Sequence, residues 1–160
     1  ARVQGAAFGG AVGLVSCCDM AVAATRASFS LSEVKIGILP ATISPYVVAA
    51  IGQRAARRYF TTAERFSAET AAQLGLVCEV VEEERLDEAV EQLVSSLLSN
   101  SPAAVRAAKQ MVFRVADRPI DDQLIAATSE IIAGIRVSPE GQEGLTAFLE
   151  KRQPAWIKEK

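Results

Sequence analysis

A glycine-rich turn opens this sequence and constrains the fold more than any other feature. Residues 4–10 read Gln-Gly-Ala-Ala-Phe-Gly-Gly, and an apolar segment with helical spacing follows at once. Glycines let the chain turn sharply and let another group approach the backbone closely. We therefore expect free backbone amides at the first turn of a buried helix, where the helix dipole stabilises negative charge. Enzymes use such amides as an oxyanion hole, although a Gly-Gly pair before a helix also occurs as plain packing.

The amino-acid composition narrows the chemistry that the chain can perform. Half of its 160 residues are hydrophobic, which suffices for the core of one domain or of part of one. The sequence has no histidine, which excludes a Ser-His-Asp triad, a Cys-His pair and a His-ligated metal site within it. Acid–base catalysis therefore falls to carboxylates, lysine, tyrosine or cysteine, and we expect no metal.

Charge and hydropathy favour neither nucleic acid nor a membrane as a partner. The net charge is −2, which provides no basic surface for nucleic acid. No apolar run has the length of a membrane span, and we expect no signal peptide. The three cysteines, Cys17, Cys18 and Cys78, are an odd number with two of them adjacent in an apolar stretch. We expect buried, reduced thiols and a cytoplasmic protein.

The spacing of apolar residues predicts short β–α units first and helices afterwards, which is an α/β class. Strands are expected at 1–3, 20–24, 28–31 and 76–81, with a loop at 33–40. Helices are expected at 11–18, from 44 onward, and at 67–74, 86–98, 105–115, 121–135 and 140–151. Ser44, Ser101 and Ser138 each precede a proline and are predicted N-caps, whereas Gly52 and Gly75 are predicted helix ends.

Several blocks of the sequence, in their order and spacing, resemble the second part of the crotonase (enoyl-CoA hydratase/isomerase) superfamily. The blocks are Gly5–Gly10, Cys18-Asp19, Ala27–Phe29, Glu33–Pro40, Arg65–Ala68 with Ala71, Gly75–Val77, Glu140–Gly144 and Ala147–Arg152. The resemblance implies a spiral of ββα units followed by helices that assemble trimers, often paired into hexamers. Residues 1–81 would be the second part of the spiral core and residues 82–160 the C-terminal helical oligomerisation region. The N-terminal half of the fold would be missing from this chain, which we expect to be part of a longer protein.

The resemblance also implies a set of site residues. Family members bind acyl-CoA thioesters and stabilise a thioester enolate between two backbone amides. The amide of Gly10 would be one donor, with Phe8 and Gly9 beside the substrate, whereas the second donor and most coenzyme A contacts belong to the N-terminal half. Glu33 matches the glutamate that protonates the substrate α-carbon. From the residues alone, Glu33 could instead be a solvated loop carboxylate or pair with Lys35.

Two residues near the C-terminus match a pair that contacts coenzyme A. Phe148 and Lys151 lie three apart on one expected helix face. In the family, the matching residues contact the adenine ring and phosphates of coenzyme A that is bound mainly by a neighbouring subunit. A core phenylalanine and an exposed lysine are the alternative, and Trp156 is expected to anchor the tail by packing. Coenzyme A is part of the substrate, so no separate cofactor is expected.

The sequence departs from the usual family pattern at two places. Gly13 stands where two-glutamate hydratases carry the second glutamate, and residues 41–46 replace a stretch that is commonly rich in glycine. Both departures resemble bacterial 3-methylglutaconyl-CoA hydratases of leucine and isovalerate breakdown and the related isohexenylglutaconyl-CoA hydratases of terpene breakdown. The resemblance implies a hydratase. Our hypothesis is that Glu33 positions the water and handles both proton steps, with the hydroxyl of Ser32 or Ser44 orienting the water. An enoyl-CoA isomerase with a single glutamate and a non-catalytic scaffold that binds coenzyme A are the alternatives.

Overall fold

The computed structural model describes residues 1–157, which form two compact units. The first unit is Ala1–Gln92, and the second begins at Leu93. Helix α4 (Leu86–Leu98) starts in the first unit and ends in the second. The domain boundary expected after residue 81 stays a prediction. None of the helices in the described residues is both long and apolar enough to span a membrane.

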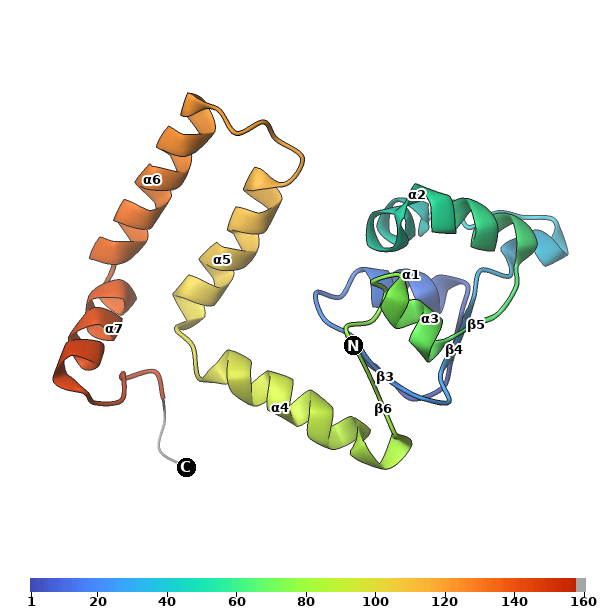
Figure 1. Ribbon diagram of the computed structural model, residues 1–160, viewed down its shortest axis with the longest axis horizontal. Helices are drawn as coiled ribbons and strands as arrows, with labels where there is room; N and C mark the ends of the chain where they lie inside the picture. The colour runs from blue at the N-terminus through green and yellow to red at the C-terminus, as the bar shows by residue number, and fades with distance from the viewer. Residues whose placement is uncertain (158–160) are drawn as a thin grey trace. The chain divides into compact units, whose positions relative to one another are not determined.

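Two small sheets organise the first unit (Figure 1). One sheet is parallel in the order β1 (Arg2–Val3), β3 (Val22–Ala24) and β6 (Glu79–Val81). The other contains β2 (Ala6–Phe8), β4 (Ser28–Ser30) and β5 (Phe66–Ser67), in which β2 is parallel and β5 antiparallel to β4. The strands expected near β1, β3, β4 and β6 are confirmed. The sequence did not predict β2 and β5.

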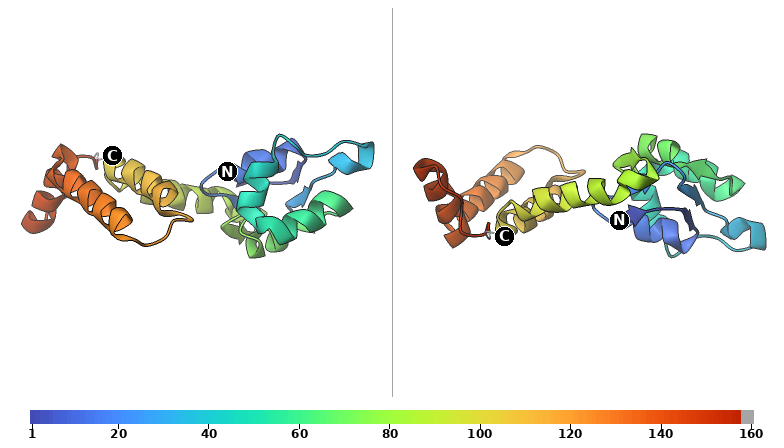
Figure 2. Two further views of the ribbon diagram at one scale, coloured as in Figure 1. Left: turned by 90° about the horizontal axis from the view of Figure 1, so that it is seen from above. Right: turned by 90° about the horizontal axis from the view of Figure 1, so that it is seen from below.

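Short helices connect and cover these strands. They are α1 (Gly10–Ser16), the 3₁₀ turn η1 (Glu33–Ile36), α2 (Ser44–Thr62), α3 (Ala68–Gln73) and the 3₁₀ turn η2 (Glu83–Arg85). Helix α2 packs on α1 and bends at Gly52, whose φ of 75° is not helical. Figure 2 shows the bend. Gly52 therefore interrupts the helix rather than ending it, whereas Gly75, with a φ of 81°, does follow the end of α3.

The core of the first unit holds α1 in place beneath α2. Val12 of α1 and Val47 of α2 are fully buried, and both belong to one apolar cluster. Phe66 of β5 stacks on Phe29 of β4 with ring centroids 5.5 Å apart, and it also contacts Tyr59 of α2 at 4.3 Å. The glycine turn before α1 is therefore supported by a packed core.

The second unit is built from helices α5 (Pro102–Val115), α6 (Asp122–Val137) and α7 (Pro139–Glu150). Ser101 accepts a hydrogen bond from the amide of Ala104, and Ser138 accepts one from the amide of Gly141, so both predicted N-caps are confirmed. Trp156 donates to the carbonyl of Ser99 and packs against Gly144, as expected of an anchor for the tail.

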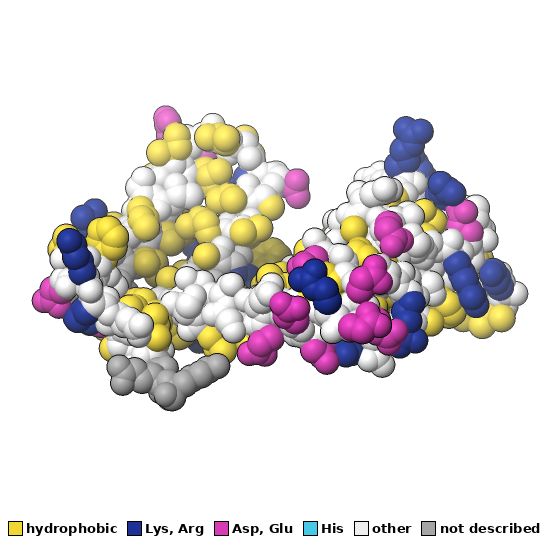
Figure 3. Space-filling view, turned by 60° about the horizontal axis from the view of Figure 1, so that its bottom comes forward, with side chains coloured by type: hydrophobic (Ala, Val, Ile, Leu, Met, Phe, Trp, Pro, Cys, Tyr) yellow, Lys and Arg dark blue, Asp and Glu magenta, His cyan; other side chains and the backbone are white. Residues whose placement is uncertain are grey.

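Hydrophobic side chains gather over the second unit in Figure 3. The exposed ones on its helices are Val112, Phe113, Ile125, Ile132, Val137, Leu145, Phe148 and Leu149. Large apolar side chains that gather on a surface in this way are typical of sites that bind other chains, so these helices have the surface character of an interface.

Besides the helix end expected at Gly52, two further sequence predictions are wrong. Ile43 rather than Ser44 occupies the N-cap position of α2, because the Ser44 hydroxyl donates to the carbonyl of Ala41 at 2.8 Å inside the preceding turn. Cys17, Cys18 and Cys78 are free thiols but exposed, not buried. Cys17 and Cys18 follow the last residue of α1 and so lie outside the apolar face of that helix.

Candidate active site

The candidate site is built on the turn between β2 and α1. The amide of Gly9 donates to the carbonyl of Ser30 at 2.9 Å, which ties the turn to β4. Gly9 has a φ of 52°, a conformation that favours glycine, and its carbonyl accepts from the amide of Val12 at 2.9 Å. Gly10 is the first residue of α1, so its amide lies outside the ladder of hydrogen bonds within the helix. Gly10 therefore lies at the start of a helix, as the sequence predicts, and its role as a donor to an oxyanion stays a prediction.

Glu33 lies against this turn. It is the first residue of η1 and is half-buried. A Cβ atom placed on Gly9 would be 3.2 Å from Oε1 of Glu33, so glycine at that position is what lets the carboxylate approach. Oε2 of Glu33 is buried and has no hydrogen-bond partner among residues 1–157. A carboxylate on a solvated loop would not have a shielded oxygen, and Lys35, the alternative partner, is exposed.

Gly13 and Ile43 are in contact. Gly13 is buried in α1, and a Cβ atom placed on it would lie 2.2 Å from Cγ2 and 2.6 Å from Cβ of Ile43. No side chain fits at position 13 while Ile43 keeps this place, so the two departures from the family pattern meet in space. Sequence reasoning missed Ile43. The sequence signal that could have identified Ile43 is that the two departures from the family pattern, at position 13 and in residues 41–46, occur together.

The two serines considered for holding water differ in their surroundings. The Ser44 hydroxyl already donates to Ala41, so it can offer only its lone pairs. Ser32 is half-buried and immediately precedes Glu33. Ser44 is half-buried as well, so the hydrogen bond of its hydroxyl is what distinguishes it from Ser32.

Phe8 is half-buried at the end of β2, next to Gly9. The guanidinium of Arg65 lies over its ring, 4.8 Å from the centroid. Such stacking is worth about 0.5–1 kcal/mol at an exposed site. Arg65 was noted in the sequence only as part of a family block, and its contact with Phe8 adds a cation beside the glycine turn.

Phe148 and Lys151 belong to the second unit. Phe148 is 81 % exposed on α7, so the alternative of a core phenylalanine is wrong for this chain. Lys151 is exposed and follows the last residue of α7 in a left-handed conformation, with a φ of 56°. Both side chains are open to a ligand or to another subunit, and their role with coenzyme A stays a prediction.

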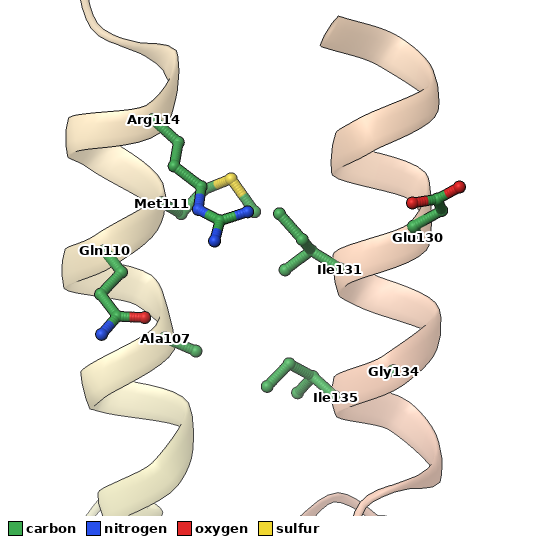
Figure 4. A pocket seen from close by; sticks show the side chains of 8 residues that line it. All are labelled: Ala107, Gln110, Met111, Arg114, Glu130, Ile131, Gly134 and Ile135. Atoms are coloured by element: carbon green, nitrogen blue, oxygen red, sulfur yellow. The ribbon is translucent and has the colours of Figure 1, made fainter. Parts of the chain in front are cut away.

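A separate cleft of about 270 Å³ lies between α5 and α6 (Figure 4). Its lining residues are Ala107, Gln110, Met111, Arg114, Glu130, Ile131, Gly134 and Ile135. Figure 4 shows Met111 and Arg114 of α5 reaching toward Ile131 of α6. None of the predicted site residues is among those that line it, so this cleft is distinct from the Glu33 site.

Together, the fold and the glutamate beside a glycine turn define a protein of the crotonase type. The family model for enoyl-CoA hydratase/isomerase matches residues 1–159. The chain belongs to the enoyl-CoA hydratase/isomerase family. The crystal structure of an enoyl-CoA hydratase/isomerase (crotonase) from Legionella pneumophila is 50 % identical, with a TM-score of 0.95 over 98 % of this chain and 60 % of that one.

Curated relatives share about a third of their residues with the chain. The (E)-benzylidenesuccinyl-CoA hydratase of Thauera aromatica is 33 % identical over 98 % of this chain and 61 % of its own length. The mitochondrial enoyl-CoA hydratase domain-containing protein 3 of Rattus norvegicus is 30 % identical over 98 % of this chain and 52 % of its own. The chain thus spans about half to three-fifths of the length of the curated relatives that it matches.

Proposed function

We propose that this chain is part of a lyase that adds water to an α,β-unsaturated acyl-CoA. The observation that carries the proposal is Glu33, whose buried Oε2 lacks a hydrogen-bond partner in the described chain and whose Oε1 lies beside the Gly9–Gly10 turn. The relatives from Thauera aromatica and, at 32 % identity, from Clostridium acetobutylicum are named as CoA-ester hydratases. The departures at Gly13 and residues 41–46 support 3-methylglutaconyl-CoA or a related branched enoyl-CoA of leucine, isovalerate or terpene breakdown.

The proposed mechanism uses one carboxylate and backbone donors. The amide of Gly10 holds the thioester oxygen as it gains charge, and removing such a donor typically costs about 3–4 kcal/mol of transition-state stabilisation. Glu33 takes a proton from the attacking water and delivers a proton to the α-carbon, while the water oxygen bonds to the β-carbon. Ser32 orients the water. A second carboxylate is not used, because Ile43 occupies the space over Gly13.

The remaining partners follow from the same proposal. The rest of the crotonase fold supplies the second oxyanion donor and most coenzyme A contacts. The exposed apolar helices of the second unit suit assembly into a trimer or a dimer of trimers. Phe148 and Lys151 would then contact coenzyme A bound to a neighbouring subunit. Coenzyme A enters as part of the substrate, and the three free cysteines suit the reducing cytoplasm.

The first experiment identifies the product in labelled water. The longest natural polypeptide that contains this chain is mixed with 3-methylglutaconyl-CoA in oxygen-18 water, and the product is analysed by mass. We expect labelled 3-hydroxy-3-methylglutaryl-CoA. Unchanged substrate would argue against this acyl-CoA, and an unlabelled positional isomer would argue against hydration.

The second experiment tests Glu33. The Glu33→Gln variant keeps the shape of the side chain but cannot exchange a proton, so we expect kcat to fall by at least about 10²-fold. Binding of the CoA ester should change little, which calorimetry with a saturated ester checks. Turnover near the wild-type rate would remove Glu33 from the mechanism.

An enoyl-CoA isomerase is the second candidate function. The contact between Gly13 and Ile43 favours it, because moving a double bond needs only one group to remove and return a proton. Hydration incorporates solvent oxygen and isomerisation does not, so the labelled-water experiment separates them. Tight binding without turnover of any enoyl-CoA would instead indicate the non-catalytic scaffold.

A further inference from the structure

The side chain of Ile43 is held firmly in the position that it occupies over α1. Ile43 is the N-cap residue of α2, and its carbonyl accepts a hydrogen bond from the amide of Val47 at 3.0 Å. Its side chain is half-buried and packs against the apolar core, with Cγ2 directed at Gly13. The backbone of Ile43 therefore cannot shift without a shift of α2, which also packs on α1.

Ile43 and Glu33 contact consecutive turns of the same helix. Glu33 approaches Gly9, the N-cap of α1, and Ile43 approaches Gly13, four residues later. Four residues of an α-helix span about 6 Å along its axis, so the two contacts are about one helical turn apart. The segment between Glu33 and Ile43 thus places one carboxylate and one branched hydrocarbon side chain next to each other along α1.

The chemical consequence is an apolar surface next to the acid–base group. The β-carbon of an enoyl-CoA lies one bond from the α-carbon that receives the proton from Glu33. A group attached to the β-carbon must therefore lie close to the surface beside Glu33. An isoleucine there offers dispersion contacts and no hydrogen bond, which suits an alkyl group.

We propose that Ile43 is a specificity-determining residue whose side chain receives the β-alkyl group of a branched acyl-CoA. This inference rests on the proposed function, because it requires that the site binds acyl-CoA. The proposed function uses the contact between Gly13 and Ile43 only to explain why a second carboxylate is lacking. The inference adds that the same contact determines which acyl groups bind.

The test measures binding without turnover. Butanoyl-CoA and 3-methylbutanoyl-CoA are saturated, differ by one methyl branch at the β-carbon, and cannot be hydrated. Their dissociation constants are measured by calorimetry for the wild type, Ile43→Val and Ile43→Ala in the longest natural polypeptide that contains this chain. One carbon in a hydrophobic pocket changes selectivity by about 10-fold or more. We expect the preference for the branched ester to fall by about 10-fold in Ile43→Ala and by less in Ile43→Val.

A matched control lies on the same helix. Ile51 is buried in α2 on the core side, so Ile51→Val makes the same chemical change away from Glu33 and should leave the preference unchanged. A preference that stays within twofold in both Ile43 variants overturns the inference while the proposed function stands. A larger preference for the branched ester in Ile43→Ala also overturns it, because Ile43 would then obstruct the group. Failure of the wild type to bind either ester overturns the proposed function itself.

Discussion

Gly13 and Ile43 are sterically coupled, because the Ile43 side chain fills the space that a side chain at position 13 would need. Side chains in a packed core tolerate little added volume, and overpacking by a single carbon typically costs about 1–3 kcal/mol. A Cβ atom on Gly13 would lie 2.2 Å from Cγ2 of Ile43, which is far inside a normal contact. This steric conflict gives a stability prediction that does not depend on activity.

We expect Gly13→Ala to lower the free energy of unfolding by about 1–3 kcal/mol. Ile43→Gly removes the two side-chain atoms that the new Cβ would clash with, Cγ2 and Cβ, so the same alanine should cost much less in that background. A double-mutant cycle from urea unfolding should give a favourable coupling of about 1 kcal/mol or more. The measurement uses the longest natural polypeptide that contains this chain.

Gly134→Ala provides the control for a glycine inside a helix. A Cβ atom on Gly134 in α6 would meet nothing within 4 Å, so alanine there should be neutral or stabilise by up to about 1 kcal/mol. If Gly13→Ala is as well tolerated as Gly134→Ala, the contact between Gly13 and Ile43 does not constrain position 13.

Single residues were predictable where a local pattern determines them. Gly10 at the start of a helix follows from local sequence, and the family resemblance identified Glu33. The contact of Ile43 with Gly13 joins residues thirty positions apart, and only the packing of α2 on α1 brings them together. The exposed cysteines show the same limit. Apolar neighbours in the sequence do not determine whether a residue lies within the helix and faces the core or lies beyond the helix end and faces solvent.

Helices were easier to predict than strands in this chain. Each long helix has a regular apolar spacing, and Ser101 and Ser138 mark their starts with side-chain caps. Strands β2 and β5 have three and two residues and exist only because they pair with β4. Such short segments carry no periodicity of their own. The proline after Ser44 misled the N-cap prediction, because the hydroxyl is used within the turn instead.

An ion pair with a testable pH dependence fastens α7 to the segment that follows it. Arg152 donates to Oε1 of Glu143 at 2.7 Å and to Oε2 at 3.0 Å, and the amide of Ala155 donates to Oε1 at 2.8 Å. The Arg152 guanidinium and then this amide lower the pKa of Glu143 from 4.5 to about 2. The folded state therefore favours the ionised carboxylate.

A depressed pKa stabilises the fold above the unfolded value and ceases to do so as pH falls. We expect the urea midpoint of Glu143→Gln to lie below that of the wild type at pH 6. The difference should shrink as the pH falls from about 4.5 toward about 2, because the wild-type carboxylate is then protonated. Arg152→Gln should reduce the same acid dependence. A constant difference between wild type and Glu143→Gln down to pH 3 would contradict the assignment. High salt should weaken the effect because both side chains are partly exposed.

The chain carries only part of the proposed site and leaves many large apolar side chains exposed. Gly9, Gly10, Glu33 and Ile43 all lie in the unit Ala1–Gln92, whereas Phe148 and Lys151 lie in the second unit. The chain covers 60 % of the related Legionella pneumophila structure, and the proposed second oxyanion donor lies in the other part of the fold. The activity is thus proposed for a larger assembly than these residues alone.

Residues 1–160 produced alone should therefore associate or be poorly soluble, and should not turn over enoyl-CoA. Ile120 is 87 % exposed, Phe148 81 % and Leu149 79 %, and β1 and β6 are the two outer strands of their small sheet. Exposed apolar side chains and open strand edges both promote association with other chains.

Light scattering coupled to size exclusion, over a tenfold range of protein concentration, would show the mass of residues 1–160 increasing with concentration. A monomer that unfolds cooperatively in urea would contradict this expectation, because two units that bury enough apolar surface by themselves need no partner. The longest natural polypeptide that contains this chain is the control, and it should have a defined mass, that of a trimer or of a pair of trimers.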